Sequence, residues 1–195
     1  IRLHGILTSG GASVNAVPAD VRYEGRVRGR NAAVIADANL KMDRCLRAGA
    51  LAMGAKVNIV TIPGYLPMVN NPPMMEFFKR NAAQLVGESN LVTHPLTHNR
   101  GGSTDMGDLS HIMPVIHPYT TAATGTGHGA DYIIQDYVQA VVNPAKAMAM
   151  TVIDLLVGDA AKAREVLATS PPVMSQSQYL ALQDSRLTEE LYEGK

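Results

Sequence analysis

Hydrophobic and polar positions alternate with a short period near the start of the chain. Residues 1–8 alternate weakly and contain β-branched side chains, which predicts a strand. Glycine and serine at residues 9–13 predict a loop. Residues 21–28 alternate regularly, with small and apolar residues on one face and charged residues on the other. The sequence therefore predicts two strands, the second with a solvated charged face.

A long helical pattern follows these strands. Apolar residues recur at helical spacing over residues 31–54, where Gly54 is a suitable terminator. Residues 57–62 are rich in β-branched side chains and predict a short strand. Strand, strand, helix and strand across residues 1–62 match most of a small α+β sandwich. A proline-rich connection after residue 62 predicts a domain boundary.

The next segments predict two helices and one strand. Residues 73–86 predict a helix that opens at Pro73, a favoured first helical position. Residues 91–93 predict a short strand, and residues 131–142 predict a helix.

The last third of the chain predicts a buried helix. Residues 144–157 are apolar nearly all round, with Asn143 as the expected cap, so we expect this helix to be largely buried. A further helix is expected over residues 160–168, capped by Asp159. The polar tail after Pro171 is expected to be loosely held.

Composition argues against several classes of partner. Hydrophobic residues make up 46% and charged residues 17%, an ordinary soluble globular balance. Seventeen basic and seventeen acidic residues give a net charge of zero, which predicts no nucleic-acid partner and no anionic membrane partner. Because the pattern shows no run of about 18 apolar residues, we expect no membrane span. The single Cys45 is compatible with a reducing compartment, so we expect a cytoplasmic protein.

Three segments in the second half combine glycines with groups that carry chemistry. They are Gly-Gly-Ser-Thr-Asp-Met-Gly-Asp-Leu-Ser-His at residues 101–111, Ile-His-Pro-Tyr at 116–119, and Gly-Thr-Gly-His-Gly-Ala-Asp-Tyr at 125–132. Glycine admits conformations closed to other residues and lets a ligand approach closely. Beside hydroxyls, acids and histidines, such glycines are typical of the floor of a site. A surface turn with incidental polar residues explains the same residue types equally well.

Other interpretations of these residues are weaker. His94 and His98 are four residues apart, but Pro95 between them opposes a helical zinc-binding pair. His111 and His117 flank an apolar run and are more typical of packed, hydrogen-bonded histidines. The glycines at 125–130 superficially resemble a dinucleotide fingerprint, but they follow a poor strand and the last glycine is misplaced.

In combination, the three segments resemble the zinc aminoacylase/carboxypeptidase family of metallohydrolases. The similarity is closest to its p-aminobenzoyl-glutamate hydrolase and β-alanyl-dipeptidase branch, and it thins after about residue 170. The resemblance implies an α/β fold. Residues 63–195 would be the C-terminal part of a phosphorylase/hydrolase-like α/β catalytic domain. Residues 1–62 would be part of an α+β ferredoxin-like lid through which a homodimer forms.

The resemblance also implies a zinc centre. His128, before the Asp131-Tyr132 pair, matches the last zinc ligand of the family. The family usually binds two zinc ions with a bridging carboxylate, and a glutamate acts as general base. No His-x-Asp pair is present here, and the Glu189-Glu190 pair is left unassigned. We therefore expect an N-terminally truncated chain whose remaining ligands lie upstream.

Substrate-binding residues follow from the same resemblance. Asn15, in Asn-Ala-Val-Pro, matches the family asparagine that holds the substrate or polarises its carbonyl. Arg28, thirteen residues later, matches the arginine that pairs with the substrate carboxylate. Gly102, Ser103 and Thr104 match the loop that holds the same carboxylate from the catalytic domain.

These implications define the expected function. We expect a zinc-dependent amidohydrolase that cleaves an amide bond next to a carboxylate, as in N-acyl amino acids, aminobenzoyl-glutamate or small dipeptides. The chain alone is expected to be inactive. The alternative is a non-catalytic binding or regulatory relative of that family. A nucleotide-binding oxidoreductase is a third possibility that rests on the glycine run alone.

Overall fold

The computed structural model describes residues 1–94 and 103–194. Helices are mixed with small antiparallel sheets of two strands each in these residues, which confirms the predicted α/β class. The chain divides into two compact units. Unit 1 contains residues 1–67, 103–104 and 180–194, and unit 2 contains residues 68–94 and 105–179. Compactness thus groups the C-terminal residues 180–194 with unit 1. The expected catalytic domain over residues 63–195 stays a prediction.

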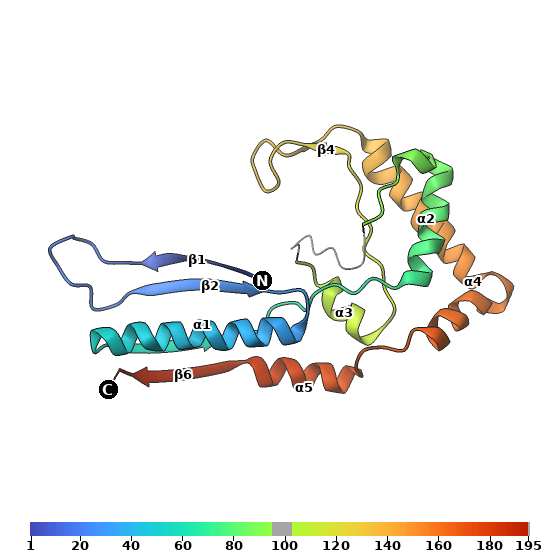
Figure 1. Cartoon of the computed structure of the whole chain (residues 1–195). Coiled ribbons are helices and arrows are strands. Elements are labelled where there is room, and N and C mark those ends of the chain that lie inside the picture. Colours follow the sequence, from blue (N-terminus) through green and yellow to red (C-terminus); the bar gives the residue numbers. More distant parts are fainter. Residues whose placement is uncertain (95–102, 195) are drawn as a thin grey trace. The chain divides into compact units, whose positions relative to one another are not determined.

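Unit 1 begins with a β-hairpin. Strand β1 (Arg2–Ser9) pairs antiparallel with β2 (Arg22–Arg28) (Figure 1). The register places Arg2 opposite Arg28. The ring of Tyr23 covers Gly5 and Gly25, where any larger side chain would overlap it. The two predicted strands are confirmed to within about one residue at each end.

Helix α1 (Ala32–Met53) has a cap at each end that the sequence encodes. The side-chain oxygen of Asn31 accepts a hydrogen bond from the amide of Val34 at 2.9 Å, which satisfies one of the free N–H groups of the first turn. Gly54 adopts a left-handed conformation at φ 59°, and its amide bonds to carbonyls of the last turn. The predicted helix over 31–54 and its terminator are confirmed.

The polar tail is ordered, so the expectation of a loosely held segment is wrong. Helix α5 (Gln176–Arg186) leads into strand β6 (Thr188–Glu193), which pairs antiparallel with β3 (Lys56–Thr61). Strand β3 lies where residues 57–62 predicted a strand. A side-chain hydrogen bond also joins the two strands: the Asn58 amide nitrogen donates to the Glu189 carboxylate at 2.8 Å. Cross-strand polar partners therefore order a segment whose composition is typical of a loop.

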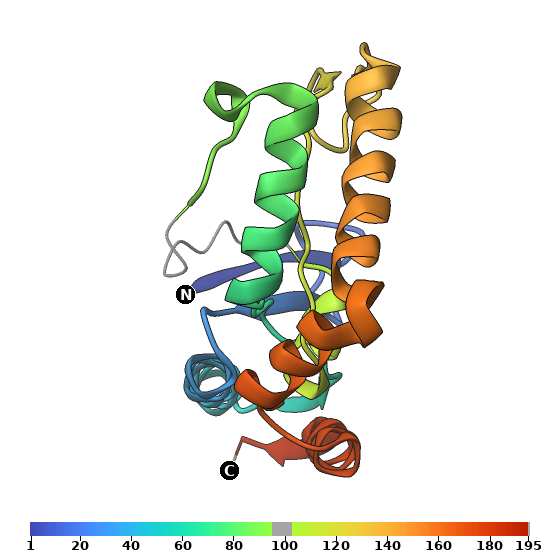
Figure 2. The ribbon, with the colours of Figure 1, turned by 90° about the vertical axis from the view of Figure 1, so that its right-hand side faces the viewer.

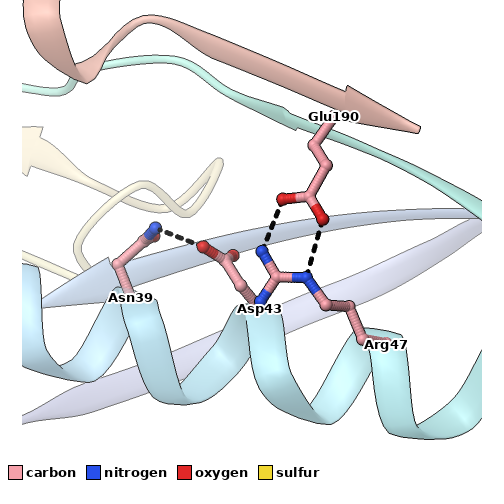
Figure 3. Close-up of polar contacts among 4 residues, drawn as sticks. All are labelled: Asn39, Asp43, Arg47 and Glu190. Atoms are coloured by element: carbon pink, nitrogen blue, oxygen red, sulfur yellow. Dashed lines mark hydrogen bonds and ion pairs between the residues drawn. The ribbon is translucent and has the colours of Figure 1, made fainter. Parts of the chain in front are cut away.

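An ion pair ties β6 to α1 within unit 1 (Figure 3). Arg47 donates from Nε to Glu190 Oε1 at 2.8 Å and from Nη2 to the other carboxylate oxygen. This two-pronged hydrogen bond lowers the pKa of Glu190 and raises the pKa of Arg47, and it outweighs the opposing effect of burial on each group. The acid left unassigned in the sequence therefore holds the C-terminal strand on the helix.

The lowered pKa of Glu190 predicts a stability loss in acid. A carboxylate with a depressed folded-state pKa stabilises the fold fully above its unfolded pKa, and this contribution disappears as pH falls below about 4.5. Unfolding curves between pH 7 and 3 should show Glu190→Gln less stable than the wild type at neutral pH, with the two converging in acid. Glu189→Gln is the matched control, and an equal pH dependence in both variants would contradict the assignment.

Two antiparallel helices dominate unit 2. Helix α2 (Pro72–Val86) begins after Asn71, which accepts the Met74 amide, and lies beside α4 (Asn143–Thr169) (Figure 2). This confirms the predicted helix over 73–86.

A buried asparagine of α2 connects the two helices. Asn81 donates to Thr151 Oγ1 at 3.2 Å and to Asp154 Oδ2 at 3.0 Å. The Asn81 hydrogen bond lowers the pKa of Asp154, and Lys162 lowers it further. Because the amide of Asn81 is buried, these partners fix the pairing of α2 with α4.

Helix α4 differs from its prediction in its first residues and in its middle. It continues directly from a π-helix, η2 (Val138–Val142), so Asn143 is already helical and donates to Gln139 at 3.0 Å instead of capping. Residues 157–160 are non-helical and break α4 into two parts. Asp159, the expected second cap, lies in this break with φ 63° and forms an ion pair with Arg164.

The expected burial of α4 is wrong. Within unit 2, α2 covers only one side of the helix, where Ala147 and Thr151 are buried. Apolar residues on its other sides are more than half exposed, namely Met148, Val152, Ile153 and Leu156. The segment Val138–Thr169 is also long and apolar enough to cross a membrane by length and composition, where the sequence pattern predicted no such segment. One such helix, with a break at residues 157–160, is weak evidence for a span.

Short elements complete unit 2. They are η1 (Glu88–Asn90), α3 (Met106–Ile112), β4 (Ala123–Thr124) and β5 (Ile133–Ile134), the last two paired antiparallel. The predicted strand at 91–93 is absent from the described structure. The predicted helix over 131–142 is replaced by a turn, β5 and the π-helix, because the chain reverses at residues 125–132 and pairs with β4.

Candidate functional site

His128 lies in a tight turn between β4 and β5. The carbonyl of Thr126 accepts the amide of Gly129 at 2.7 Å, which makes His128 the third residue of a four-residue turn. His128 has φ 66°, in the left-handed region that favours glycine, and its side chain is exposed. Its neighbours on both sides are glycines, so an imidazole occupies the left-handed position between them.

This conformation, which Asp159 and Ala160 also adopt, supports a hypothesis of function at His128. A non-glycine residue at positive φ costs roughly 1 kcal/mol or more, and such strain is concentrated at active sites and ligand clamps. An exposed imidazole on a short turn is accessible to a metal ion, for which its nitrogen is a common ligand. The structure thus presents His128 in a manner suited to ligation.

The side chain of Asp131 bonds back to the first residue of this turn, a role that the sequence pattern did not predict. Its Oδ2 accepts the amide of Thr126 at 3.1 Å. The motif contained the signal for this contact, because a carboxylate three residues after the histidine can accept a hydrogen bond from the amide two residues before it. Asp131 therefore bonds to the loop backbone around His128.

The described residues fall short of a three-ligand metal site. Residues 1–94 and 103–194 contain no group of three or more His, Cys, Asp or Glu side chains placed to hold a metal ion. Zinc sites use three or four protein ligands. The described residues therefore do not by themselves fit a zinc centre, and His128 would supply one ligand among others.

The histidines at 111 and 117 are packed. His111 is buried, and its Nδ1 lies 2.9 Å from the carbonyl of Gly107, an arrangement in which the ring nitrogen donates. His117 lies edge-on to the ring of Tyr119 with centroids 5.0 Å apart, and its amide donates to Asn70. For His111 this confirms the interpretation as a packed, hydrogen-bonded residue. His98 lies outside the described residues.

The glycine run at 125–130 does not have the context of a dinucleotide site. It follows a strand of two residues, and a turn and a second strand come after it. A dinucleotide fingerprint requires a helix that opens directly after the glycines, so that the helix N-terminus meets the pyrophosphate. The structure therefore gives this possibility no support.

The predicted substrate residues of the hairpin lie at its two ends. Asn15 is exposed in the loop between β1 and β2, where its side-chain oxygen accepts the hydroxyl of Ser13. Arg28 is half-buried at the opposite end of β2, beside the first residue of β1. The six-residue step from Arg22 to Arg28 alone spans about 20 Å. One hairpin thus does not bring Asn15 and Arg28 together.

The carboxylate loop is described only in part. Gly102 lies outside the described residues, Ser103 is exposed, and Thr104 is half-buried just before α3. Compactness groups Ser103 and Thr104 with unit 1 and His128 with unit 2. The roles of Asn15, Arg28 and this loop stay predictions.

Comparison with known proteins points to peptidases. The chain is 29% identical over 161 residues to Xaa-Arg dipeptidase of Mus musculus and 28% identical over 165 residues to Xaa-Arg dipeptidase of Homo sapiens. Each alignment covers 80% of this chain but 37% of the relative, so the chain spans well under half the length of these proteins. No family model and no solved structure matches the chain.

The similarity supports a peptidase or amidohydrolase relationship. Both relatives are named as dipeptidases, which are enzymes that hydrolyse an amide bond. This agrees with the broad class implied by the sequence motifs. It does not single out the aminobenzoyl-glutamate branch.

Proposed function

We propose that this chain is part of a zinc-dependent amidohydrolase that cleaves the amide bond of small dipeptides bearing a free carboxylate. The observation that carries the proposal is the similarity to two dipeptidases over 80% of the chain. N-acyl amino acids and aminobenzoyl-glutamate present the same amide next to a carboxylate and form the wider substrate class.

In this proposal His128 is one ligand of a zinc centre, and two zinc ions bind to the complete protein. Bound zinc would supply Lewis-acid activation of water and of the scissile carbonyl. The support from this chain is the exposed imidazole in a left-handed turn conformation. The other ligands and the general base would come from outside the described residues.

The chain's contribution to substrate binding is electrostatic. Arg28 presents a planar guanidinium, which can bond both oxygens of a carboxylate, and Gly102, Ser103 and Thr104 offer backbone and hydroxyl donors to the same group. Asn15 would polarise the scissile carbonyl. In a homodimer formed through residues 1–62, Asn15 and Arg28 need not act from the same copy of the hairpin.

Zinc content and turnover test this proposal. The complete protein should contain about two zinc ions per chain and hydrolyse dipeptides, with chelation abolishing turnover. The 195-residue chain alone should bind zinc weakly and show no turnover, because it holds His128 without a group of partner ligands in its described residues. A complete protein without zinc or turnover that still binds carboxylate-bearing peptides would favour the non-catalytic relative. Robust zinc-dependent hydrolysis by the chain alone would contradict the division of ligands.

A further inference from the structure

We propose that Asp131 is a positioning residue that holds His128 in its left-handed conformation, so that the imidazole would be preorganised to ligate a metal ion. The inference rests on the proposed role of His128 as a ligand. Asp131 itself would act on the loop backbone and would not ligate.

The first argument is the hydrogen bonding of the loop. Asp131 Oδ2 accepts the amide of Thr126 at 3.1 Å, so the carboxylate bridges the two ends of a six-residue segment with His128 inside it. A second turn follows, in which Tyr132 donates to the carbonyl of Gly129 at 3.2 Å. The carboxylate thus adds a side-chain link to a loop whose two turns are each closed by a bond from backbone to backbone.

The second argument is the space left around Asp131. A Cβ at Gly129 would overlap Asp131 Oδ1, and a Cβ at Gly125 would overlap the carbonyl of Asp131. Gly125 also has φ 91°, which other residues rarely adopt. Two glycines of the motif are therefore required by the close approach of Asp131 to the loop backbone.

The third argument is the strain at His128. A strained residue in an exposed loop persists only when its surroundings over-determine its conformation. Around His128 those constraints are the short β4–β5 pairing, the turn bond at Thr126 and the Asp131 bridge. Removing the bridge should therefore release the turn into more extended conformations and move the imidazole.

Backbone measurements on the chain without metal test the bridge directly. In Asp131→Ala, the Cα and Cβ chemical shifts of His128 should move toward those of a flexible peptide, and the Thr126 amide should exchange faster. Asp131→Asn keeps an acceptor oxygen and should restore both signals. Asp136→Ala is the matched control, because Asp136 accepts a different amide, that of Gln139, at 2.9 Å. Unchanged His128 shifts in Asp131→Ala, or a failure of asparagine to restore them, would overturn the proposal.

Zinc binding by the complete protein tests the functional consequence. Asp131→Ala should weaken zinc affinity about tenfold, as removal of outer-shell support commonly does, whereas Asp131→Asn should stay close to the wild type. Loss of zinc in Asp131→Asn with restored His128 shifts would show that the charge acts directly, and positioning would be wrong. If His128→Ala leaves zinc unchanged, the proposed function and the preorganising role both fail, while the backbone measurement still reports whether Asp131 shapes the turn.

Discussion

Replacing His128 with alanine in the complete protein should remove at least one zinc ion per chain and abolish most dipeptide hydrolysis. A zinc site that loses one of its three or four protein ligands cannot keep its geometry. The structure adds that His128 occupies a turn position at φ 66° which a glycine would fill with less strain. Zinc content by elemental analysis and turnover under saturating substrate measure the effect.

Substitution with glycine separates ligation from folding. Compared without metal, His128→Gly should be as stable as the wild type or gain up to about 1 kcal/mol in the free energy of unfolding, because glycine adopts positive φ without penalty. It should lose zinc and turnover to the same extent as the alanine variant. A residue whose removal stabilises the fold and eliminates activity is maintained for function. Unchanged zinc content and turnover in both variants would refute the assignment.

Arg28→Ala should lower kcat/KM for carboxylate-bearing dipeptides roughly 30- to 1000-fold. This factor corresponds to a loss of about 2–4 kcal/mol in transition-state stabilisation. Arg28 is half-buried at the end of β2. Alanine removes the guanidinium that would pair with the planar substrate carboxylate. Thr104→Val should shift kcat/KM in the same direction by a smaller amount. Steady-state kinetics with a dipeptide and its amide-capped analogue measure the effect.

The comparison of substrates makes this prediction specific. The capped analogue lacks the carboxylate, so it should lose far less from Arg28→Ala than the free dipeptide does. Arg28→Lys should recover only part of the loss, because a lysine cannot form the two-pronged bond. Arg26→Ala is the matched control, two residues earlier on the same face of β2 and exposed. Equal losses on both substrates would exclude a role in carboxylate binding.

Local chemistry explains which elements could be predicted from the sequence. The helix from Ala32 to Met53 is bounded by Asn31, whose side chain caps a free amide, and by Gly54, which accepts a left-handed backbone. Both signals act within four residues and need no tertiary partner. The two strands of the first hairpin are encoded in the same local manner, by alternation and by β-branched side chains.

Contacts between distant segments explain the predictions that were wrong. The tail was expected to be loose, but β6 is ordered by β3 and by the Arg47–Glu190 pair, whose partners are 143 residues apart. The apolar helix α4 was expected to be buried, but α2 covers only one of its sides within unit 2. Residues 131–142 have a helical pattern, yet Ile133 and Ile134 pair with β4 across the reversed chain.

For the candidate site, the sequence by itself determined that a histidine stands among glycines before an acid and an aromatic residue, and the resemblance of this motif to a metallohydrolase family implied a metal ligand at His128. The same resemblance implied that Arg28, Ser103 and Thr104 bind a carboxylate. Only the tertiary structure decided that His128 is exposed in a left-handed turn, that Asp131 bonds back to Thr126, and that Asn15 and Arg28 lie at opposite ends of one hairpin. Residue types state which chemistry is available, whereas backbone conformation and register decide which groups meet.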